Sequence, residues 1–314
     1  MQTSKYLYSI GCSHNEIDLC QLEIKYLFNK EGHHKLLLSD IEIAPSSSAF
    51  IKRRIDILST SKDYPTLIDN IKKDNITTQG FKVEYFVLDG DTTAYANRLQ
   101  KLRDIGYSIE GQSDYYNPTT TYALCYYEGL WCFGILNKNG YEWHKHKQKP
   151  FSYSNSISMS IAKALVNIAS KGNKKSKLLD ACCGVGTIML EACFAGYDIE
   201  GCDINWKLCV NARDNISHFG YNAPVYTFDI KDICKQYDAA IIDLPYNLLS
   251  SITDNDVMDI IKSTADISDR LIIVSTVDIN KAINQAGLNL SDNCSIGKKG
   301  NTKFSRRIWV CVKE

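Results

Sequence analysis

The sequence predicts a chain of two parts, in which a mixed α+β region precedes an α/β domain built on a doubly wound, mostly parallel sheet. Three observations favour this division. The chain has 314 residues, more than one hydrophobic core usually organises. Short apolar strands alternate with helical patterns from residue 177 to residue 286, the rhythm of βαβ units. Before residue 150, strands and helices follow one another in a different, mixed order.

The first half is expected to hold two small modules. A ferredoxin-like unit would have strands at 5–12, 34–38 and 49–58 and helices at 14–30 and 66–73. A second module would follow, with a strand at 81–88, a helix at 93–105 and a hairpin around Glu128-Gly129. The polar, lysine-rich segment 137–153 contains Pro150 and is expected to be a linker. The predicted domains are therefore residues 1–150 and 151–314.

The second half begins with a long helix, because Ile157, Ile161, Leu165 and Ile168 share one helical face. Five short apolar strands and four helices are then expected. The strands are placed at 177–182, 198–203, 225–228, 239–243 and 271–275, and the helices at 188–194, 207–219, 256–265 and 280–286. The apolar, β-branched segment 308–312 is expected to pair with a strand near 288–296. This terminal hairpin would complete a seven-stranded sheet.

Composition excludes several classes of protein. No stretch reaches the roughly 18 apolar residues of a membrane span, and the first twelve residues lack the pattern of a signal peptide. The twelve cysteines form no C-x-x-C pair, and several lie inside apolar strand patterns. We therefore expect reduced, mostly buried thiols in a cytoplasmic protein that binds no metal.

A glycine loop follows the first strand of the second half. Cys182, Gly184, Gly186 and Thr187 come directly after the strand that carries Asp180. Glycines at such a turn let backbone N–H groups approach a ligand without a Cβ in the way. A dinucleotide fingerprint requires Gly or Ala three positions after the second glycine, and this chain has Met189 there. The loop therefore indicates a nucleotide-like cofactor other than NAD.

Three aspartates lie at the ends of three successive strands. Asp180 precedes the glycine loop, Asp203 is followed by Ile204, and Asp229 is followed by Ile230. The carboxyl ends of parallel strands meet at one crevice, so these side chains are expected to converge there. The pattern predicts a site for S-adenosylmethionine (SAM). Asp180 would meet its amino end, Asp203 both ribose hydroxyls and Asp229 the adenine amine.

A second motif, Asp243-Leu244-Pro245-Tyr246, follows the fourth strand. An exocyclic base amine is a poor nucleophile because its lone pair is delocalised into the ring. The Asp243 carboxylate and the Leu244 carbonyl are expected to accept the amine hydrogens and direct that lone pair at the methyl group. Pro245 would hold the turn rigid, and Tyr246 would stack on the base. No metal is required for this chemistry.

These motifs resemble those of the amino-methyltransferases, which carry (Asp/Asn)-Pro-Pro-(Tyr/Phe) where this chain has Leu244 in place of the first proline. From residue 151 to 313 the chain is most similar to the THUMP-associated tRNA guanosine-N2 methyltransferases. The segment 151–156 is similar to the family's segment over the methionine end of SAM. Residues 81–88, 93–105 and 117–119 and the following hairpin resemble a THUMP domain. The resemblance implies a tRNA substrate gripped by residues 1–150 and a flipped guanosine.

The family also implies a basic track for RNA phosphates. The formal net charge is zero, but residues 143–179 and 293–313 contain no acidic side chain. The expected RNA-binding residues are Lys145, Lys147, Lys298, Lys299, Arg306 and Arg307. Ribosomal RNA guanosine and DNA adenine remain alternative acceptors, and a catalytically silent RNA-binding protein of the same fold is an alternative from another class. The sequence leaves open the oligomeric state and the modified nucleotide.

Overall fold

The computed structural model describes residues 5–32, 34–88, 90–153, 156–245, 253–298 and 301–313. The chain divides into two compact units that alternate along the sequence. The first comprises residues 1–10, 35–45 and 51–139, and the second comprises residues 11–34, 46–50 and 140–314. Two segments of the N-terminal half, 11–34 and 46–50, therefore group with the C-terminal half.

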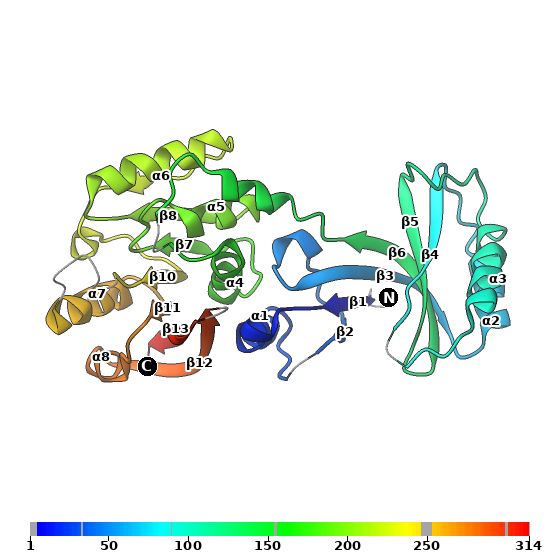
Figure 1. The fold of residues 1–314 in the computed structure, drawn as a ribbon, viewed down its shortest axis with the longest axis horizontal. Helices are drawn as coiled ribbons and strands as arrows, with labels where there is room; N and C mark the ends of the chain where they lie inside the picture. The colour runs from blue at the N-terminus through cyan, green and yellow to red at the C-terminus, as the bar shows by residue number, and fades with distance from the viewer. Residues whose placement is uncertain are drawn as a thin grey trace. The chain divides into compact units, whose positions relative to one another are not determined.

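A six-stranded sheet runs through the first unit in the order β2-β1-β3-β6-β5-β4 (Figure 1). Its strands are β1 Lys5–Ile10, β2 Leu36–Ser39, β3 Ile51–Ser61, β4 Phe81–Tyr85, β5 Thr120–Tyr127 and β6 Leu130–Lys138. Strand β4 pairs with β5 in parallel, and the other pairs are antiparallel. The α+β class is confirmed. The two expected modules instead share one sheet, because the long strand β3 pairs with both β1 and β6.

Two helices of the first unit, α2 (Tyr64–Lys73) and α3 (Tyr95–Gly106), pack on this sheet. Their buried side chains Leu67, Ile71 and Ile105 share a core with Phe133 of β6. The expected hairpin between β5 and β6 is confirmed. Its two turn residues, Glu128 and Gly129, have φ of 50° and 81°. Two successive left-handed residues give the two-residue turn that matches the twist of antiparallel strands.

The second unit contains a seven-stranded sheet in the order β12-β13-β11-β10-β7-β8-β9. Its strands are β7 Lys177–Asp180, β8 Asp198–Cys202, β9 Val225–Tyr226, β10 Ala239–Asp243, β11 Arg270–Ser275, β12 Leu288–Lys298 and β13 Asn301–Lys313. Strands β7 to β11 are mutually parallel, whereas β13 is antiparallel to both neighbours. This arrangement confirms the doubly wound sheet and its terminal antiparallel hairpin.

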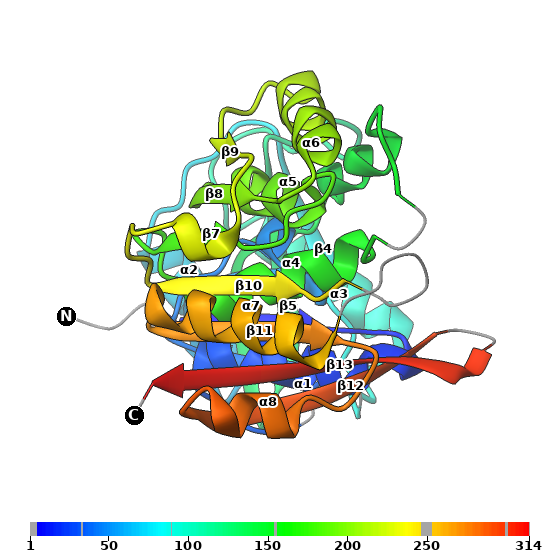
Figure 2. The same ribbon diagram turned by 90° about the vertical axis from the view of Figure 1, so that its left-hand side faces the viewer.

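Helices cover both faces of this sheet. Helices α7 (Asp254–Asp266) and α8 (Asn280–Gln285) pack together over β11 and β12, as Figure 2 shows. The opposite face carries α4 (Met159–Ser170), α5 (Thr187–Phe194) and α6 (Trp206–His218), with α5 in contact with both of the others. The sheet residues between these layers are buried and apolar, as in parallel sheets generally.

Helix α1 (Ile17–Phe28) belongs to the second unit, where it packs against α4 and β12. Its buried residues include Leu19, Leu27 and Phe28. On the same helix, Lys25 Nζ and Tyr26 Oη lie 2.8 Å from the two carboxylate oxygens of Asp292 in β12. These contacts join residues that are more than 260 positions apart in the sequence.

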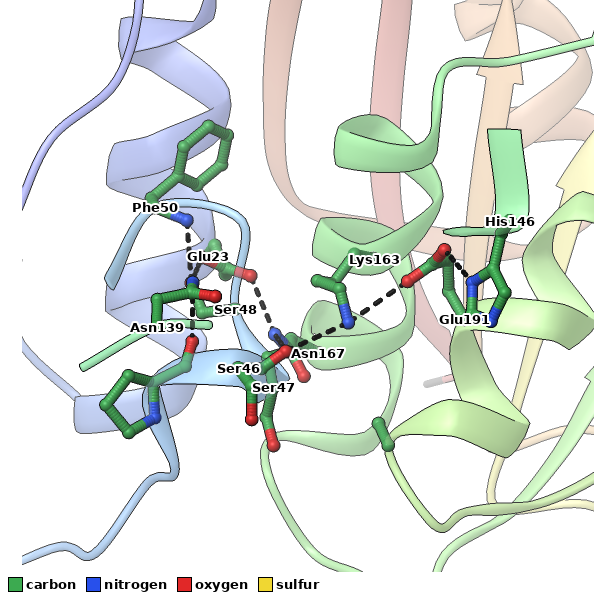
Figure 3. A network of polar contacts seen from close by, with 12 residues as sticks. Glu23, Ser46, Ser47, Ser48, Phe50, Asn139, His146, Lys163, Asn167 and Glu191 are labelled. Atoms are coloured by element: carbon green, nitrogen blue, oxygen red, sulfur yellow. Dashed lines mark hydrogen bonds and ion pairs between the residues drawn. The ribbon is translucent and has the colours of Figure 1, made fainter. Parts of the chain in front are cut away.

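A buried polar network links α1 to α4 (Figure 3). Glu23 of α1 accepts hydrogen bonds from Asn167 Nδ2 at 2.7 Å and from Ser48 Oγ at 2.6 Å. Lys163, one helical turn before Asn167, donates to the Ser46 carbonyl at 3.1 Å. Segments 11–34 and 46–50 therefore satisfy polar groups of α4 that would otherwise be buried without partners.

The network continues from α4 to α5 and to the short helix η3 (Glu142–Gln148). Lys163 Nζ lies 3.0 Å from Glu191 Oε2, and His146 Nδ1 lies 2.7 Å from Glu191 Oε1. The segment 137–153, expected to be a linker, thus contains a helix that buries Trp143 and His146. No helix in the described parts of the chain is long and apolar enough to cross a membrane.

Candidate active site

A cavity of about 390 Å³ lies at the carboxyl ends of β7, β8 and β10. This position is where doubly wound sheets bind their ligands, and the volume is in the range of about 300–1,000 Å³ found for cofactor pockets. The structure brings nine of the predicted residues into its lining. They are Asp180, Cys182, Gly184, Thr187, Asp203, Ile204, Asp243, Leu244 and Pro245.

The glycine loop forms one wall of the cavity. Gly184 and Gly186 have φ of +52° and +79°, a region that other residues rarely adopt. Gly186 lies behind the cavity lining, where a Cβ would come within 3.3 Å of the Ala212 Cβ on α6. Met189 packs on Gly201, since its sulfur occupies the place of a Cβ there. Met189, which stands where the dinucleotide fingerprint has Gly or Ala, thus fills the space beside Gly201 on β8.

Asp180 is the least satisfied polar residue of the site. Its side chain is buried, and neither carboxylate oxygen has a hydrogen-bond partner within the part of the chain that the structure describes. Burial, followed by the nearby charges of Asp243 and Asp203, raises the pKa of Asp180 well above its usual range. The buried hydroxyl of Thr187 likewise lacks a partner among the described residues. Buried polar atoms are normally paired, so this end of the cavity is suited to a ligand with several hydrogen-bond donors.

Asp203 is held in place by two backbone N–H groups. Gly184 N donates to Oδ2 at 3.0 Å, and Asn205 N donates to Oδ1 at 2.8 Å. Burial raises the pKa of Asp203 despite these bonds. Each carboxylate oxygen retains a lone pair for a further donor. The fixed carboxylate can therefore accept from both hydroxyls of a diol, beside the largely exposed side chain of Ile204.

Asp229 and Ile230 are not in the cavity lining, contrary to the prediction. Strand β9 ends at Tyr226, before Asp229 is reached. Asp229 instead caps the short helix η4 (Ile230–Asp232), where its carboxylate accepts from Lys231 N and pairs with Lys231 Nζ at 2.9 Å. Ile230 is buried in the core of the second unit. The strand predicted at 225–228 is thus two residues longer than β9, and Asp229 does not lie at its carboxyl end.

The second motif lies at the end of β10, where Asp243 pairs in register with Val274 of β11. Leu244 N donates to the Val274 carbonyl at 3.0 Å, so strand pairing continues one residue past Asp243. The Leu244 side chain is buried in the core. A proline at this position has no N–H to donate, so leucine adds one hydrogen bond to the sheet. Tyr246 lies outside the described residues.

Segment 151–157 contributes a further wall. Tyr153, Ser156 and Ile157 line the cavity, whereas Ser154 and Asn155 lie outside the described residues. The sequence did not single out five other lining residues: Cys183, Val185, Ile188, Asn205 and Leu208. Their positions were informative, because they lie within the glycine loop or follow it or Asp203 closely in the sequence. Cys182 also lines the cavity, and burial raises its pKa well above the usual range, which is consistent with a packing role.

Among the predicted RNA-binding residues whose side chains the structure describes, none lines the cavity. Lys147 is exposed, and Lys145 Nζ lies 5.4 Å from the centre of the Tyr221 ring. Arg307 Nη1 pairs with Asp278 at 2.8 Å, and Arg306 lies in register with Ile296 on the β12–β13 hairpin. The side chain of Lys298 and the whole of Lys299 lie outside what the structure describes.

Comparison with known proteins supports a transferase. Residues 146–256 match the family model described as "RMKL-like, methyltransferase domain". This segment is therefore similar to a methyltransferase domain. It contains the glycine loop, Asp203 and the Asp243 motif, and S-adenosylmethionine is the cofactor that the sequence predicted for it.

One curated relative is the tRNA (guanine(10)-N2)-dimethyltransferase of Methanothermobacter thermautotrophicus. It is 31% identical over 121 residues, which are 37% of this chain and 35% of the relative. The chain thus matches about a third of that relative's length. Among solved structures, TrmN from Thermus thermophilus aligns with this chain at 14% identity and a TM-score of 0.48. The alignment covers 99% of this chain and 100% of TrmN. A predicted N6-adenine-specific DNA methylase from Listeria monocytogenes covers 99% of this chain with 97% of its own, at 13% identity and a TM-score of 0.47.

Among the described residues, no group of three or more His, Cys, Asp or Glu side chains is arranged to hold a metal ion. None of the twelve cysteines, all of which lie in the described parts of the chain, forms a disulfide.

Proposed function

We propose that this protein is a SAM-dependent methyltransferase that methylates the exocyclic N2 amine of a guanosine in tRNA. The observation that carries this proposal is the convergence of Asp180, Asp203 and Asp243 in one cavity beside a glycine loop. The match of residues 146–256 to a methyltransferase domain and the partial match to a tRNA guanine-N2 enzyme support the reaction class and the acceptor.

The cofactor half of the cavity is formed by Asp180, Thr187 and Asp203. When bound, SAM supplies the activated methyl group. Asp203, already fixed by Gly184 and Asn205, accepts from the two ribose hydroxyls. Asp180 and Thr187 have buried oxygens in need of donors, and the cationic amino group of the methionine end provides them. Ile204, with 76% of its surface exposed, offers an apolar side chain to the adenine. Asp229 is not included in this proposal, because it does not line the cavity.

The acceptor half is formed by the motif at the end of β10. Asp243 and the Leu244 carbonyl accept the two hydrogens of the guanosine amine, which leaves its lone pair directed at the methyl group. Pro245 restrains the turn, and Tyr246 stacks on the base. Positioning of the two reactants supplies most of the rate enhancement. A paired guanosine has to leave the RNA helix before its amine reaches such a cavity.

Residues 1 to about 150 are proposed to select the RNA in the cytoplasm. Basic residues from both halves of the chain are proposed to contact its phosphates: Lys145, Lys147, Lys298, Lys299, Arg306 and Arg307. Because these contacts neutralise phosphates, affinity for RNA should fall as salt rises. The proposed role of residues 1–150 in selecting the RNA has to be tested in the full chain. A fragment starting at residue 151 would lose the partners of Lys163, Asn167 and Glu191 that residues 23, 46–48 and 146 provide.

The test is methyl transfer from tritiated SAM to bulk tRNA, ribosomal RNA and DNA by the full chain and by Asp243→Ala. We expect label in tRNA with the wild-type chain, N2-methylguanosine on nucleoside mass spectrometry, and no transfer by the variant. Label in ribosomal RNA or DNA alone would assign one of the alternative acceptors. SAM binding without transfer to any of the three would favour the silent RNA-binding protein.

A further inference from the structure

Asn215 on α6 is a buried residue with no surface exposure and an unusually complete set of partners. Its Oδ1 accepts from Phe151 N at 2.9 Å. Its Nδ2 donates to the Phe151 carbonyl at 2.9 Å and to the Val185 carbonyl at 2.9 Å. The single amide thus uses both its donors and its acceptor on main-chain groups.

These partners belong to two segments of the chain that contribute to the cavity lining. Val185 lies between Gly184 and Gly186, and it lines the cavity. Phe151 leads into the segment that contributes Tyr153, Ser156 and Ile157. Asn215 itself is not a lining residue, so it acts on the cavity through the backbone of these two segments.

The segment after Phe151 depends on such side-chain contacts for its position. Residues 149–153 and 156–158 belong to no helix or strand. Phe151 and Tyr153 are 39% and 45% exposed, so core packing holds them only in part. The preceding helix η3 is anchored separately, through His146 to Glu191 and to Tyr221 Oη at 3.0 Å. Among the described residues between that anchor and α4, Asn215 ties the main chain of Phe151 to the glycine loop.

We propose that Asn215 is a positioning residue that holds the main chain of Phe151 against the glycine loop and thereby sets the spacing between that loop and the cavity-lining residues Tyr153, Ser156 and Ile157. This inference rests on the proposed function for the identity of the ligand. It concerns binding and not the reacting atoms, so it predicts a change in the KM for SAM with little change in kcat.

The test compares Asn215→Ala with Asn167→Ala in the full chain. Asn167 is a matched control because it is another buried helical asparagine, and its amide bonds Glu23 and the Ser47 carbonyl away from the cavity. Both variants lose buried hydrogen bonds and should melt at lower temperature. Only Asn215→Ala should raise the KM and the Kd for SAM, by about tenfold, since two walls of the cavity are released.

A second readout does not depend on the ligand. Chymotrypsin cuts after Phe151 and Tyr153, so its rate of cleavage there reports how firmly the segment is held in the free protein. We expect faster cleavage in Asn215→Ala than in Asn167→Ala. Failure of the wild-type chain to bind SAM would refute the proposed function, but the cleavage rates of the Asn215 and Asn167 variants would still test the role of Asn215.

Phe151→Pro provides a second variant outside the core: it removes the N–H that donates to Asn215 Oδ1 and an exposed ring, and it fixes φ at residue 151. It should raise the KM for SAM less than Asn215→Ala and keep kcat. Equal KM values and equal cleavage rates for the Asn215 and Asn167 variants would overturn the proposal. If Asn215→Ala does not fold, an unchanged KM for SAM in Phe151→Pro would overturn the proposal instead.

Discussion

Replacing Asp180 by asparagine separates the stability of the free protein from its affinity for the cofactor. The two side chains have the same shape, but the amide carries no charge to bury. In the ligand-free protein the Asp180 carboxylate has no partner among the described residues, so the exchange should stabilise the fold. With SAM present, the same exchange removes the acceptor proposed for the amino group and should weaken binding.

The direction of the pH dependence follows from the raised pKa of Asp180. In the unfolded chain an aspartate loses its proton near pH 3.9, whereas the folded protein holds it to higher pH. Between these two values the folded state binds more protons, so the free energy of unfolding of the ligand-free protein falls as pH rises. The variant lacks this fall. Its advantage in stability should be smallest near pH 4 and should grow toward neutral pH.

The expected magnitudes can be measured with ordinary methods. The exchange removes the buried charge, whose cost is about 1.4 kcal/mol for each pH unit by which folding raises the pKa of Asp180, and each kcal/mol gained should raise the Tm by about 2–4 °C. Loss of a charged hydrogen bond worth about 1.5–3 kcal/mol should weaken SAM binding by about 10- to 150-fold. Thermal scans between pH 4.5 and 8, with and without SAM, and calorimetric titration give both quantities.

Asp292→Asn is a suitable control, because that carboxylate is paired with Lys25 and Tyr26. It should lower the Tm at neutral pH and leave SAM affinity unchanged. A ligand-free Asp180→Asn protein that is less stable than the wild type at neutral pH would refute the reasoning about an unsatisfied carboxylate. Unchanged affinity for SAM would refute its role in binding.

Three further substitutions test other parts of the site and fold. Asp203→Ala should weaken SAM binding by about 10- to 150-fold in calorimetry, and a folded variant of normal affinity would exclude the bidentate role. Leu244→Pro removes the N–H that bonds Val274 and a buried side chain, so Tm should fall while methyl transfer per folded molecule persists; an unchanged Tm would show that this bond contributes nothing. Glu191→Gln leaves Lys163 buried without its counter-charge and should cost about 3–5 kcal/mol in chemical denaturation, an effect that an unshifted midpoint would contradict.

The second half of the chain was largely predictable because its signals are local. Each strand of the parallel sheet is a short apolar run, and each turn that carries Asp180, Asp203 or Asp243 adjoins such a run. Asp229 was misplaced because the run before it looks like a longer strand than β9, which has only two residues. Asn215 gave no signal at all, since an asparagine within a helical pattern usually faces solvent.

The first half was less predictable because its decisive contacts are distant in sequence. The periodicity of α1 indicates an apolar face but not that β12 and α4 cover it. Nothing in the run of basic residues at 143–149 distinguishes His146, which is buried against Glu191, from the exposed Lys145 and Lys147. The pairing of β3 with β6 likewise merges two segments that read as separate modules.

The position of α1 has a consequence for the order of events during synthesis. Lys25 is synthesised well before its partner Asp292, which lies 267 residues further along the chain. At a translation rate of about 5–20 residues per second, roughly 15–50 s pass between the two. Throughout that interval the apolar face of α1 lacks its β12 partner, and Glu23 lacks Asn167 for a large part of it. Helix α1 is thus synthesised long before β12 can cover it, and a chaperone that shields nascent apolar helices would find a binding site on α1 during that interval.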